Sequence, residues 1–363
     1  MSNTRPDILQ IIQEVKEKRS NSIDLSDQSI TEFPEEILEL DWLEEIDLRN
    51  NKIEILPDSI SKFKNLKKIN LIGNPLTYVM NIFGLILDYS TFLKQKELIS
   101  KQNIVGIMAN RILPVYEFNH LLELTNLKYL NLRGNKLAKI PDSISNLINL
   151  VNLDISSNRL REFPENITNL TELTSLNIAW NGLTKLPESI RKLSNLTSLN
   201  LSNNSISKLP ENLGKLIKLV NLDLTDNSIQ LLPDSISKLR NLTSLNLSRN
   251  ELLKFPENID KLINLANLDL TTNSIKTIPD NICKLTHLTN LTLADNSIRI
   301  LPDSFCELRN LTNLDLSSNQ LQALPDNISK LKNLKRLDLN WNHLKNIPNS
   351  IGELNSLTRL NLT

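Results

Sequence analysis

Three histidines, His120, His287 and His343, are the side chains best suited to acid–base or metal chemistry, and they lie far apart in the sequence. None of them forms the HExxH pair that binds zinc from one face of a helix. The sequence also lacks the GxSxG turn of serine hydrolases and the GxxxxGK(S/T) phosphate loop. With only 7 glycines in 363 residues, it lacks the clustered glycines of a nucleotide-binding fold. The sequence therefore predicts a protein that is not an enzyme and has no cofactor.

Cys283 and Cys306 are the only cysteines, and 23 residues separate them. If the chain repeats with that period, the two side chains stack on adjacent turns and can approach disulfide distance. Two cysteines cannot hold together a small secreted domain, and the first residues, MSNTRPDILQ, do not read as a secretory signal. We therefore expect two free thiols in a reducing compartment.

The composition argues against several classes of function. The chain carries 41 basic and 41 acidic residues and has a pI near 6.9, which argues against a nucleic-acid binder. No run of about 18 apolar residues occurs, so no membrane span is expected. These features together predict a cytoplasmic protein.

Asparagine recurs at a constant spacing through most of the sequence. Every copy lies in the frame LxxLxLxxNxL, and a proline follows each asparagine by six residues. The ten asparagines, each 23 residues after the last, are Asn135, Asn158, Asn181, Asn204, Asn227, Asn250, Asn273, Asn296, Asn319 and Asn342. The same frame extends back to Asn51 and Asn74, so one structural unit is repeated along the chain.

The frame has a direct physical interpretation. LxL is typical of a short strand whose two leucines face the same interior. The asparagine side chain turns inward and hydrogen-bonds backbone groups of the neighbouring turn, which satisfies buried polar groups. The proline begins a single-turn or irregular segment on the opposite, convex side. One repeat cannot bury its own apolar face, so the repeats must stack into a solenoid.

The spacing divides the chain into four parts. Residues 1–19 are expected to form a capping helix, residues 20–76 three repeats, and residues 122–363 the regular array. Between them, residues 77–121 form an enlarged, irregular repeat with an inserted helix on the convex side. The apolar residues of that helix, near helical spacing, are Val79, Ile82, Phe83, Ile86 and Leu93. The alternative is a break between two arrays, 20–76 and 122–363.

The two ends of the sequence differ in character. Residues 6–20 read as an amphipathic helix with Pro6 in its first turn and Ile8, Ile11, Ile12 and Val15 on one side, as expected of a helix covering the edge of the first repeat. The last residues, LTRLNLT, contain no such helix. The final strand is therefore expected to be an open edge, covered either by further chain or by a partner.

Two tryptophans stand out among the residues that the strands expose. Trp180 and Trp341 each lie immediately before a repeat asparagine and are 161 residues, or seven repeats, apart. They therefore belong to one row on the solenoid surface. Exposed tryptophan is a favoured anchor in protein interfaces. The alternative is that each ring only packs over a loop.

Charge varies along the same expected concave face. Asp223, Asp269 and Asp315 occupy one strand position in every second repeat, and the basic residues Arg336 and Arg359 follow near the end. Because the aspartates lie two repeats apart, they do not converge on one metal ion. The early strands carry basic residues as well: Lys67, Lys68, Lys128 and Arg133. An acidic centre with basic ends suits a partner of complementary charge, and the alternative is an ordinary solvated face. The predicted protein-binding residues are Trp180, Trp341, Arg336, Arg359, Arg249, Asp223, Asp269, Asp315 and Tyr129.

The frame LxxLxLxxNxL resembles the leucine-rich repeat, and the resemblance covers most of the chain. The element Leu186-Pro187-x-x-Ile190 is similar to the intracellular repeats of Ras-suppressor and plant Ras-group proteins. Asp24-Leu25-Ser26, followed by ITEFP at residues 30–34, is similar to the first repeat of Roco proteins, although no nucleotide-binding domain follows here. The resemblance implies an α/β horseshoe with a parallel concave sheet, an N-terminal capping helix and a convex face of irregular and 3-10 segments.

These families imply a cytoplasmic scaffold, often around small GTPases. The resulting hypothesis is a non-enzymatic protein that binds a protein partner on its concave face. The identity of the partner is open, with a small GTPase or another signalling protein as candidates. One alternative is the targeting part of a bacterial effector or of a larger signalling protein. Another is a surface adhesion protein.

Overall fold

The structure is a computed structural model that describes residues 4–57, 59–60, 63, 65–76, 85–88, 104–108 and 123–362. The chain divides into two compact units. The first contains Met1–Lys136 and Pro141–Ile155, and the second contains Leu137–Ile140 and Ser156–Thr363. The four-part division expected from the repeat spacing, with bounds at residues 19, 76 and 121, stays a prediction.

The first unit starts with one α-helix and continues with short parallel strands. Each strand pairs with the next one along the chain. The elements are α1 (Pro6–Lys18), β1 (Ser22–Asp24), η1 (Glu35–Glu39), β2 (Glu45–Asp47), β3 (Lys68–Asn70), β4 (Leu85–Asp88), β5 (Ile104–Met108), β6 (Tyr129–Asn131), η4 (Asp142–Asn146) and β7 (Asn152–Asp154), where η denotes a 3-10 helix.

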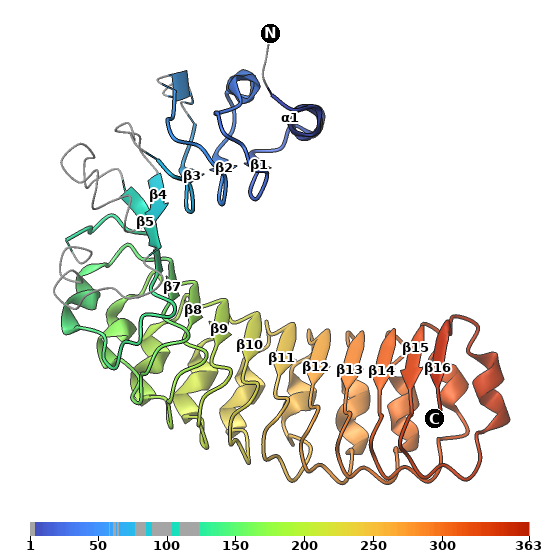
Figure 1. The fold of residues 1–363 in the computed structure, drawn as a ribbon. Coiled ribbons are helices and arrows are strands. Elements are labelled where there is room, and N and C mark those ends of the chain that lie inside the picture. Colours follow the sequence, from blue (N-terminus) through green and yellow to red (C-terminus); the bar gives the residue numbers. More distant parts are fainter. Residues whose placement is uncertain are drawn as a thin grey trace. The chain divides into compact units, whose positions relative to one another are not determined.

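The second unit alternates 3-10 helices with strands in a strictly regular order (Figure 1). Its strands are β8 (Ser175–Asn177), β9 (Ser198–Asn200), β10 (Asn221–Asp223), β11 (Ser244–Asn246), β12 (Asn267–Asp269), β13 (Asn290–Thr292), β14 (Asn313–Asp315), β15 (Arg336–Asp338) and β16 (Arg359–Asn361). Its 3-10 helices are η5 (Glu165–Asn169), η6 (Glu188–Lys192), η7 (Glu211–Lys215), η8 (Asp234–Lys238), η9 (Ile259–Lys261), η10 (Asp280–Lys284), η11 (Asp303–Glu307), η12 (Ile328–Lys330) and η13 (Asn349–Glu353).

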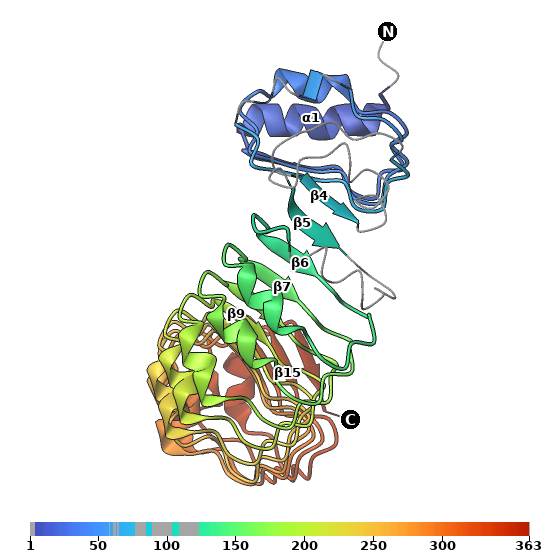
Figure 2. The ribbon, with the colours of Figure 1, turned by 90° about the vertical axis from the view of Figure 1, so that its left-hand side faces the viewer.

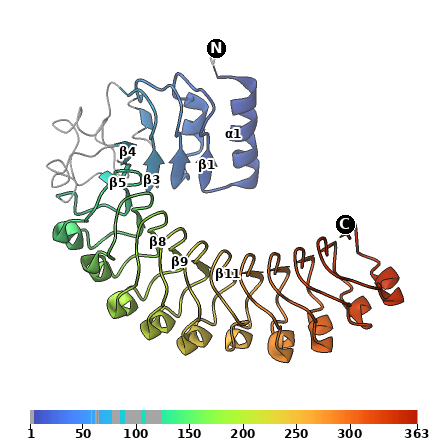
Figure 3. The ribbon, with the colours of Figure 1, turned by 60° about the horizontal axis from the view of Figure 1, so that its bottom comes forward.

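The core of the second unit is a spine of stacked leucines. Leu222 pairs with Leu199 on one side and with Leu245 on the other, so the register repeats every 23 residues. The Leu222 side chain is only 1% exposed. Within this unit the strands form the inner layer and the 3-10 helices the outer layer (Figure 3). The expected parallel sheet with a convex face of 3-10 segments is confirmed.

The asparagine ladder predicted from the spacing is also confirmed. The Asn227 amide Nδ2 donates to the carbonyl oxygens of Leu201 (3.0 Å) and Leu224 (3.1 Å). Its Oδ1 accepts from the backbone N–H of Ile206 at 2.9 Å. One buried side chain therefore joins two adjacent coils and satisfies backbone groups that no strand partner reaches.

Helix α1 covers the first repeat, as its apolar spacing predicted. Ile8 and Ile12 are buried, and the helix packs against β1 and η1 (Figure 2). Lys16 forms an ion pair of 2.8 Å with Glu39 in η1. The apolar side of the helix therefore closes the edge that the first strand would otherwise expose.

The helix expected within residues 77–121 is wrong for residues 85–88. Leu85–Asp88, which include Ile86, form strand β4 and pair with β3 and β5. A short apolar run fits both helical and extended spacing, and the hydrogen-bonding groups of the neighbouring strands favour the extended form here. The other residues of that expected helix, Val79, Ile82, Phe83 and Leu93, lie outside the described residues.

The outer layer of the second unit contains a buried carboxylate. The Asp260 side chain in η9 is 4% exposed and lies 3.0 Å from the Lys284 ammonium and 3.4 Å from that of Lys261. Burial alone would raise the pKa of Asp260, but the hydrogen bonds from Lys284 and Lys261 outweigh it and lower the pKa below the ordinary 3.8.

We expect Asp260→Asn to lower the free energy of unfolding by about 1–2 kcal/mol at pH 7. Because the folded-state pKa is below the unfolded one, the carboxylate stabilises the fold above about pH 4 and loses this effect as the pH falls through the lowered pKa. Urea unfolding at pH 7 and at pH 3 checks this. If the variant and the parent protein differed in free energy of unfolding by the same amount at both pH values, this role of the carboxylate would be contradicted.

Candidate protein-binding surface

The strands of the second unit present alternate residues to solvent. In β10, Leu222 points into the core, while Asn221 is exposed and Asp223 is half-buried on the opposite side. The other strands of this unit repeat the pattern because side chains alternate along a strand. We call the surface made by these outward residues of β8–β16 the inner face (Figure 3).

A row of unusual backbone conformations borders the inner face. In each repeat of the second unit, the residue before the ladder asparagine has a positive φ of about 54°. Trp180 and Trp341 occupy this row, are 61% and 77% exposed, and have φ values of 54° and 57°. Arg249 is an exposed member of the same row. We call these residues the rim row.

Tryptophan is an unexpected residue in the rim row. The left-handed conformation favours glycine and asparagine and is costly for bulky side chains. Other rim positions carry Ser157, Asn203, Asp226, Thr272, Asp295 and Ser318. Both rings are held in this conformation and exposed to solvent, so neither contributes to the buried core.

The structure brings three of the predicted residues together near the end of the second unit. Arg336, Arg359 and Asp315 line a hollow of about 250 Å³ on the inner face, together with Asp338 and Asn361. Arg336 pairs with Arg359 across β15 and β16, and Asp315 pairs with Asp338 across β14 and β15. Two guanidinium groups therefore stand on adjacent strands beside two carboxylates. We call this hollow the Arg–Asp pocket.

The charged groups of the Arg–Asp pocket form few interactions with the rest of the described protein. Among the described residues, no carboxylate lies within ion-pair distance of Arg336 or Arg359. Both arginines are exposed, whereas Asp338 accepts a hydrogen bond of 2.5 Å from the Asn361 amide. Neighbouring like charges on paired strands are unfavourable unless a partner neutralises them. The pocket is therefore suited to an acidic group of a ligand.

The aspartate row has a structural role that sequence reasoning missed. Asp223 Oδ1 accepts from the backbone N–H and the hydroxyl of Thr225, at 3.0 and 2.6 Å. Asp315 does the same for Ser317, and Asp269 accepts from the N–H of Thr271. This two-residue pattern is the side-chain turn typical of Asp and Asn. The row therefore holds the ends of the strands, and one oxygen of each carboxylate is engaged in that task.

Thr292 interrupts this pattern between Asp269 and Asp315. Its hydroxyl is buried and has no hydrogen-bond partner within the described parts of the chain. We expect Thr292→Asn to raise the free energy of unfolding by about 1 kcal/mol, because the amide oxygen can accept from the N–H of Ala294. The reciprocal change, Asn246→Thr, is expected to lower it by a similar amount. Thermal unfolding of both variants checks these two predictions. Melting temperatures that shift in the same direction in both variants would contradict them.

Tyr129 is the one predicted binding residue in the first unit. It lies in β6, is half-buried, and has the Lys68 ammonium 4.9 Å from its ring centre. Lys68 is also 3.4 Å from Glu45. Tyr129 thus belongs to a local cluster of β2, β3 and β6 and not to the inner face of the second unit.

A second asparagine ladder escaped the sequence analysis. The Asn195 and Asn241 amides donate to the carbonyl oxygens of Thr171 and Ile217, each 24 residues earlier. His287 occupies the same repeat position and contacts the Ile263 carbonyl oxygen through Nδ1 at 2.8 Å. The recurring Asn-Leu before each strand could have revealed it. This use of His287 gives that residue a structural role.

The two cysteines are free in the structure. Cys306 is fully buried in η11, and burial raises its pKa to about 12. A thiol with that pKa is almost entirely protonated at neutral pH and is a poor nucleophile. Among the described residues, no group of three His, Cys, Asp or Glu side chains could hold a metal ion. In the same part of the chain, no helix is long and apolar enough to cross a membrane.

The repeat pattern and the fold define the class of protein. The pattern of the leucine-rich repeat region family matches residues 109–201, 188–278 and 276–363, which together make up more than half of the chain, and a leucine rich repeat pattern matches residues 21–76. The chain therefore belongs to the leucine-rich repeat family. Domains of this family generally mediate interactions between proteins and are typically not enzymes.

Several solved structures are similar over nearly the whole chain. A leucine-rich repeat protein of Leptospira interrogans is 29% identical with a TM-score of 0.61, covering 100% of this chain and 88% of the other. An internalin of Listeria monocytogenes is 24% identical with a TM-score of 0.66, covering 98% and 94%. The plant peptide hormone receptor RGFR1, solved in complex with RGF2, is 25% identical with a TM-score of 0.64, covering 94% and 62%. A search of the curated proteins found no match.

Proposed function

We propose that this protein is a scaffold that binds a protein partner on the inner face of its second unit. The observation that carries the proposal is the Arg–Asp pocket, where Arg336 and Arg359 stand side by side and exposed on paired strands. The family to which the chain belongs supports the same use, and so does the solved complex of the plant receptor with RGF2.

The predicted residues of the inner face and the rim row make two kinds of contact with the partner. Arg336 and Arg359 bind an acidic group of the partner, because two guanidinium groups can each donate paired hydrogen bonds to a carboxylate. Trp180 and Trp341 contact apolar surface from the rim row. At about 4.8 Å per strand, seven repeats separate the two rings by roughly 34 Å. Only a folded protein or a long peptide can reach both.

The class of partner is a separate part of the proposal. The Ras-suppressor-like element Leu186-Pro187-x-x-Ile190 supports a cytoplasmic scaffold that acts with a small GTPase or another signalling protein. A photo-crosslinking amino acid at Asn221, on the inner face, identifies the partner by mass spectrometry. The same probe at Lys238, in the outer-layer helix η8, is the control. Equal capture from both positions would argue against the inner face.

The rim row allows a test that separates binding from folding. We expect Trp180→Asn with Trp341→Asn to lower the affinity for the crosslinked partner by about tenfold or more. Because asparagine accepts a positive φ more readily than tryptophan, the free energy of unfolding should stay unchanged or rise by up to about 2 kcal/mol. Calorimetric titration and thermal unfolding measure the two effects. An unchanged affinity would remove both tryptophans from the interface.

A further inference from the structure

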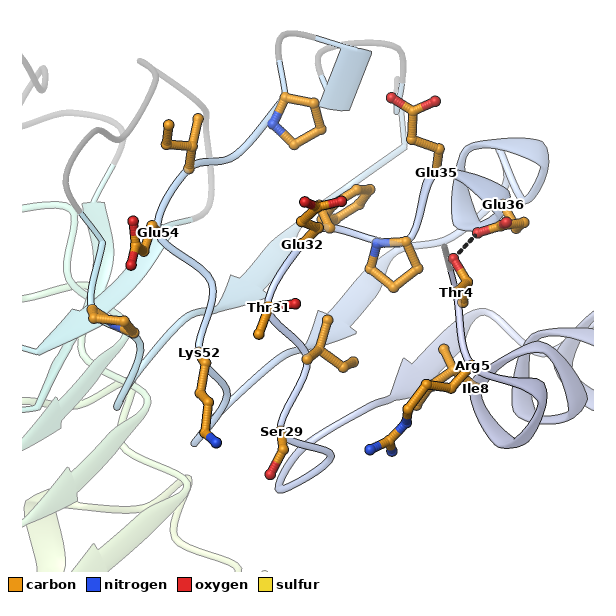
Figure 4. A pocket seen from close by; sticks show the side chains of 16 residues that line it. Thr4, Arg5, Ile8, Ser29, Thr31, Glu32, Glu35, Glu36, Lys52 and Glu54 are labelled. Atoms are coloured by element: carbon orange, nitrogen blue, oxygen red, sulfur yellow. Dashed lines mark hydrogen bonds between the residues drawn. The ribbon is translucent and has the colours of Figure 1, made fainter. Parts of the chain in front are cut away.

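The first unit contains a large hollow on the flank of its early repeats (Figure 4). Its volume is about 1250 Å³. The walls come from the residues around the start of α1, from residues 29–36 after β1, from the segment after β2, and from Pro75. Small-molecule sites usually measure roughly 300–1,000 Å³, so this hollow is suited to a larger ligand. We call it the flank groove.

The flank groove has an apolar side chain that the core does not use. Ile55 lines it and is 61% exposed, although it directly precedes the buried Leu56. Phe33 and Pro34 belong to the same lining and are themselves buried, so their apolar surface is mostly used by the fold. Ile55 therefore offers an exposed branched side chain in this lining, which can contact one apolar side chain of a ligand.

The described part of the lining is predominantly negative. Within it, four glutamates stand against two cations, Arg5 and Lys52. Arg5 is already paired with Asp7 at 2.8 Å, outside the lining. Figure 4 shows Glu32 near the middle of the lining, Glu54 at one side of it, and Lys52 near Ser29.

Two of the glutamates are available to a ligand. Glu36 accepts a hydrogen bond of 2.7 Å from the Thr4 hydroxyl, which connects the segment before α1 to η1. Glu32 and Glu35 are exposed, and the described residues supply no hydrogen bond or ion pair to either. Reversing their charges therefore changes the groove without removing a contact on which the fold depends.

We propose that the flank groove binds a linear, basic segment of a partner protein, with lysine or arginine side chains on both sides of one apolar residue. The apolar residue contacts Ile55, and the basic side chains pair with Glu32 and Glu35. The charge excludes anionic lipid surfaces and nucleic acids as occupants, because both would be repelled. This site is independent of the inner face, since all its residues belong to the first unit.

The second unit supplies a matched control. The sequence Glu32-Phe33-Pro34-Glu35 recurs as Glu162-Phe163-Pro164-Glu165, and Phe255-Pro256-Glu257 repeats its last three residues. Glu162 and Glu257 therefore occupy the same repeat positions as Glu32 and Glu35, and both are exposed. Converting either pair to lysine changes the net charge of the whole protein by the same amount.

The experiment uses the full chain and fluorescence anisotropy with a labelled peptide of one central leucine flanked on each side by three lysines. We expect saturable binding that Glu32→Lys with Glu35→Lys weakens at least tenfold, whereas Glu162→Lys with Glu257→Lys changes it less than twofold. Ile55→Ser, and a peptide with serine in place of the leucine, should each weaken binding severalfold. Thermal unfolding verifies that the variants are folded. Equal weakening by both lysine pairs would overturn the site, and so would no effect of Ile55→Ser together with no effect of the leucine replacement.

Discussion

Replacing Asn250 by alanine is expected to lower the free energy of unfolding by about 4 kcal/mol. The Asn250 amide donates to the carbonyl oxygens of Leu224, Leu247 and Ser248 at 2.9–3.2 Å. Its Oδ1 accepts from the backbone N–H of Ile229 at 3.0 Å. Alanine leaves these groups buried without their partner, and each unsatisfied buried group costs about 1–3 kcal/mol. Urea unfolding followed by circular dichroism measures the change.

Asn221→Ala is the matched control for this variant. Asn221 is exposed on β10, and none of the hydrogen bonds within the described residues involves its side chain. Its replacement should change the free energy of unfolding by less than about 0.5 kcal/mol. If the two variants were equally stable, the ladder would contribute little, and stacking of the leucines alone would hold the coils together.

Reversing the two positive charges of the Arg–Asp pocket is expected to lower the affinity for the partner by about hundredfold or more. In Arg336→Glu with Arg359→Glu, four acidic side chains face the partner's acidic group in place of two arginines and two aspartates. Loss of a desolvated charge pair costs roughly 2–5 kcal/mol, and about 2.7 kcal/mol already corresponds to a hundredfold change. Titration with the partner captured through Asn221 measures the effect.

The control variant has the same change in net charge, but its two substitutions lie away from the Arg–Asp pocket. Arg161→Glu with Arg191→Glu alters two exposed arginines, the second of them in the outer-layer helix η6. We expect less than a threefold change in affinity. A similar loss in both double variants would mean that long-range attraction, and not the pocket, determines binding. Raising the salt concentration would then abolish binding for the parent protein as well.

Much of the fold could be predicted because one physical requirement recurs in every repeat. A buried leucine pair and an inward asparagine must return every 23 residues for the coils to stack, and Leu222 and Asn227 both meet that requirement. The capping helix was predictable for the same reason, since Ile8 and Ile12 must cover an open strand. Strand β4 was not, because Leu85–Asp88 lie outside the regular frame and their spacing also suits a helix.

The candidate sites were less predictable, because they depend on which neighbours the exposed side chains meet. Arg336, Arg359 and Asp315 could be assigned to one face from their repeat positions, and the structure places them in one hollow. The aspartates' hydrogen bonds to Thr225 and Ser317 depend on the backbone path after each strand, which the repeat frame does not specify. The flank groove depends on how the residues before α1 approach two loops, and no periodic pattern describes that.

The rim row places equivalent residues of the second unit at regular distances along the solenoid. Because every coil adds one strand at a nearly constant spacing, residues at equivalent positions lie at multiples of about 4.8 Å. Losing or gaining one coil between Trp180 and Trp341 would shift the two rings by one such step and leave the leucine spine intact. Recognition length can thus change in whole increments during evolution, while the chemistry of each contact is preserved.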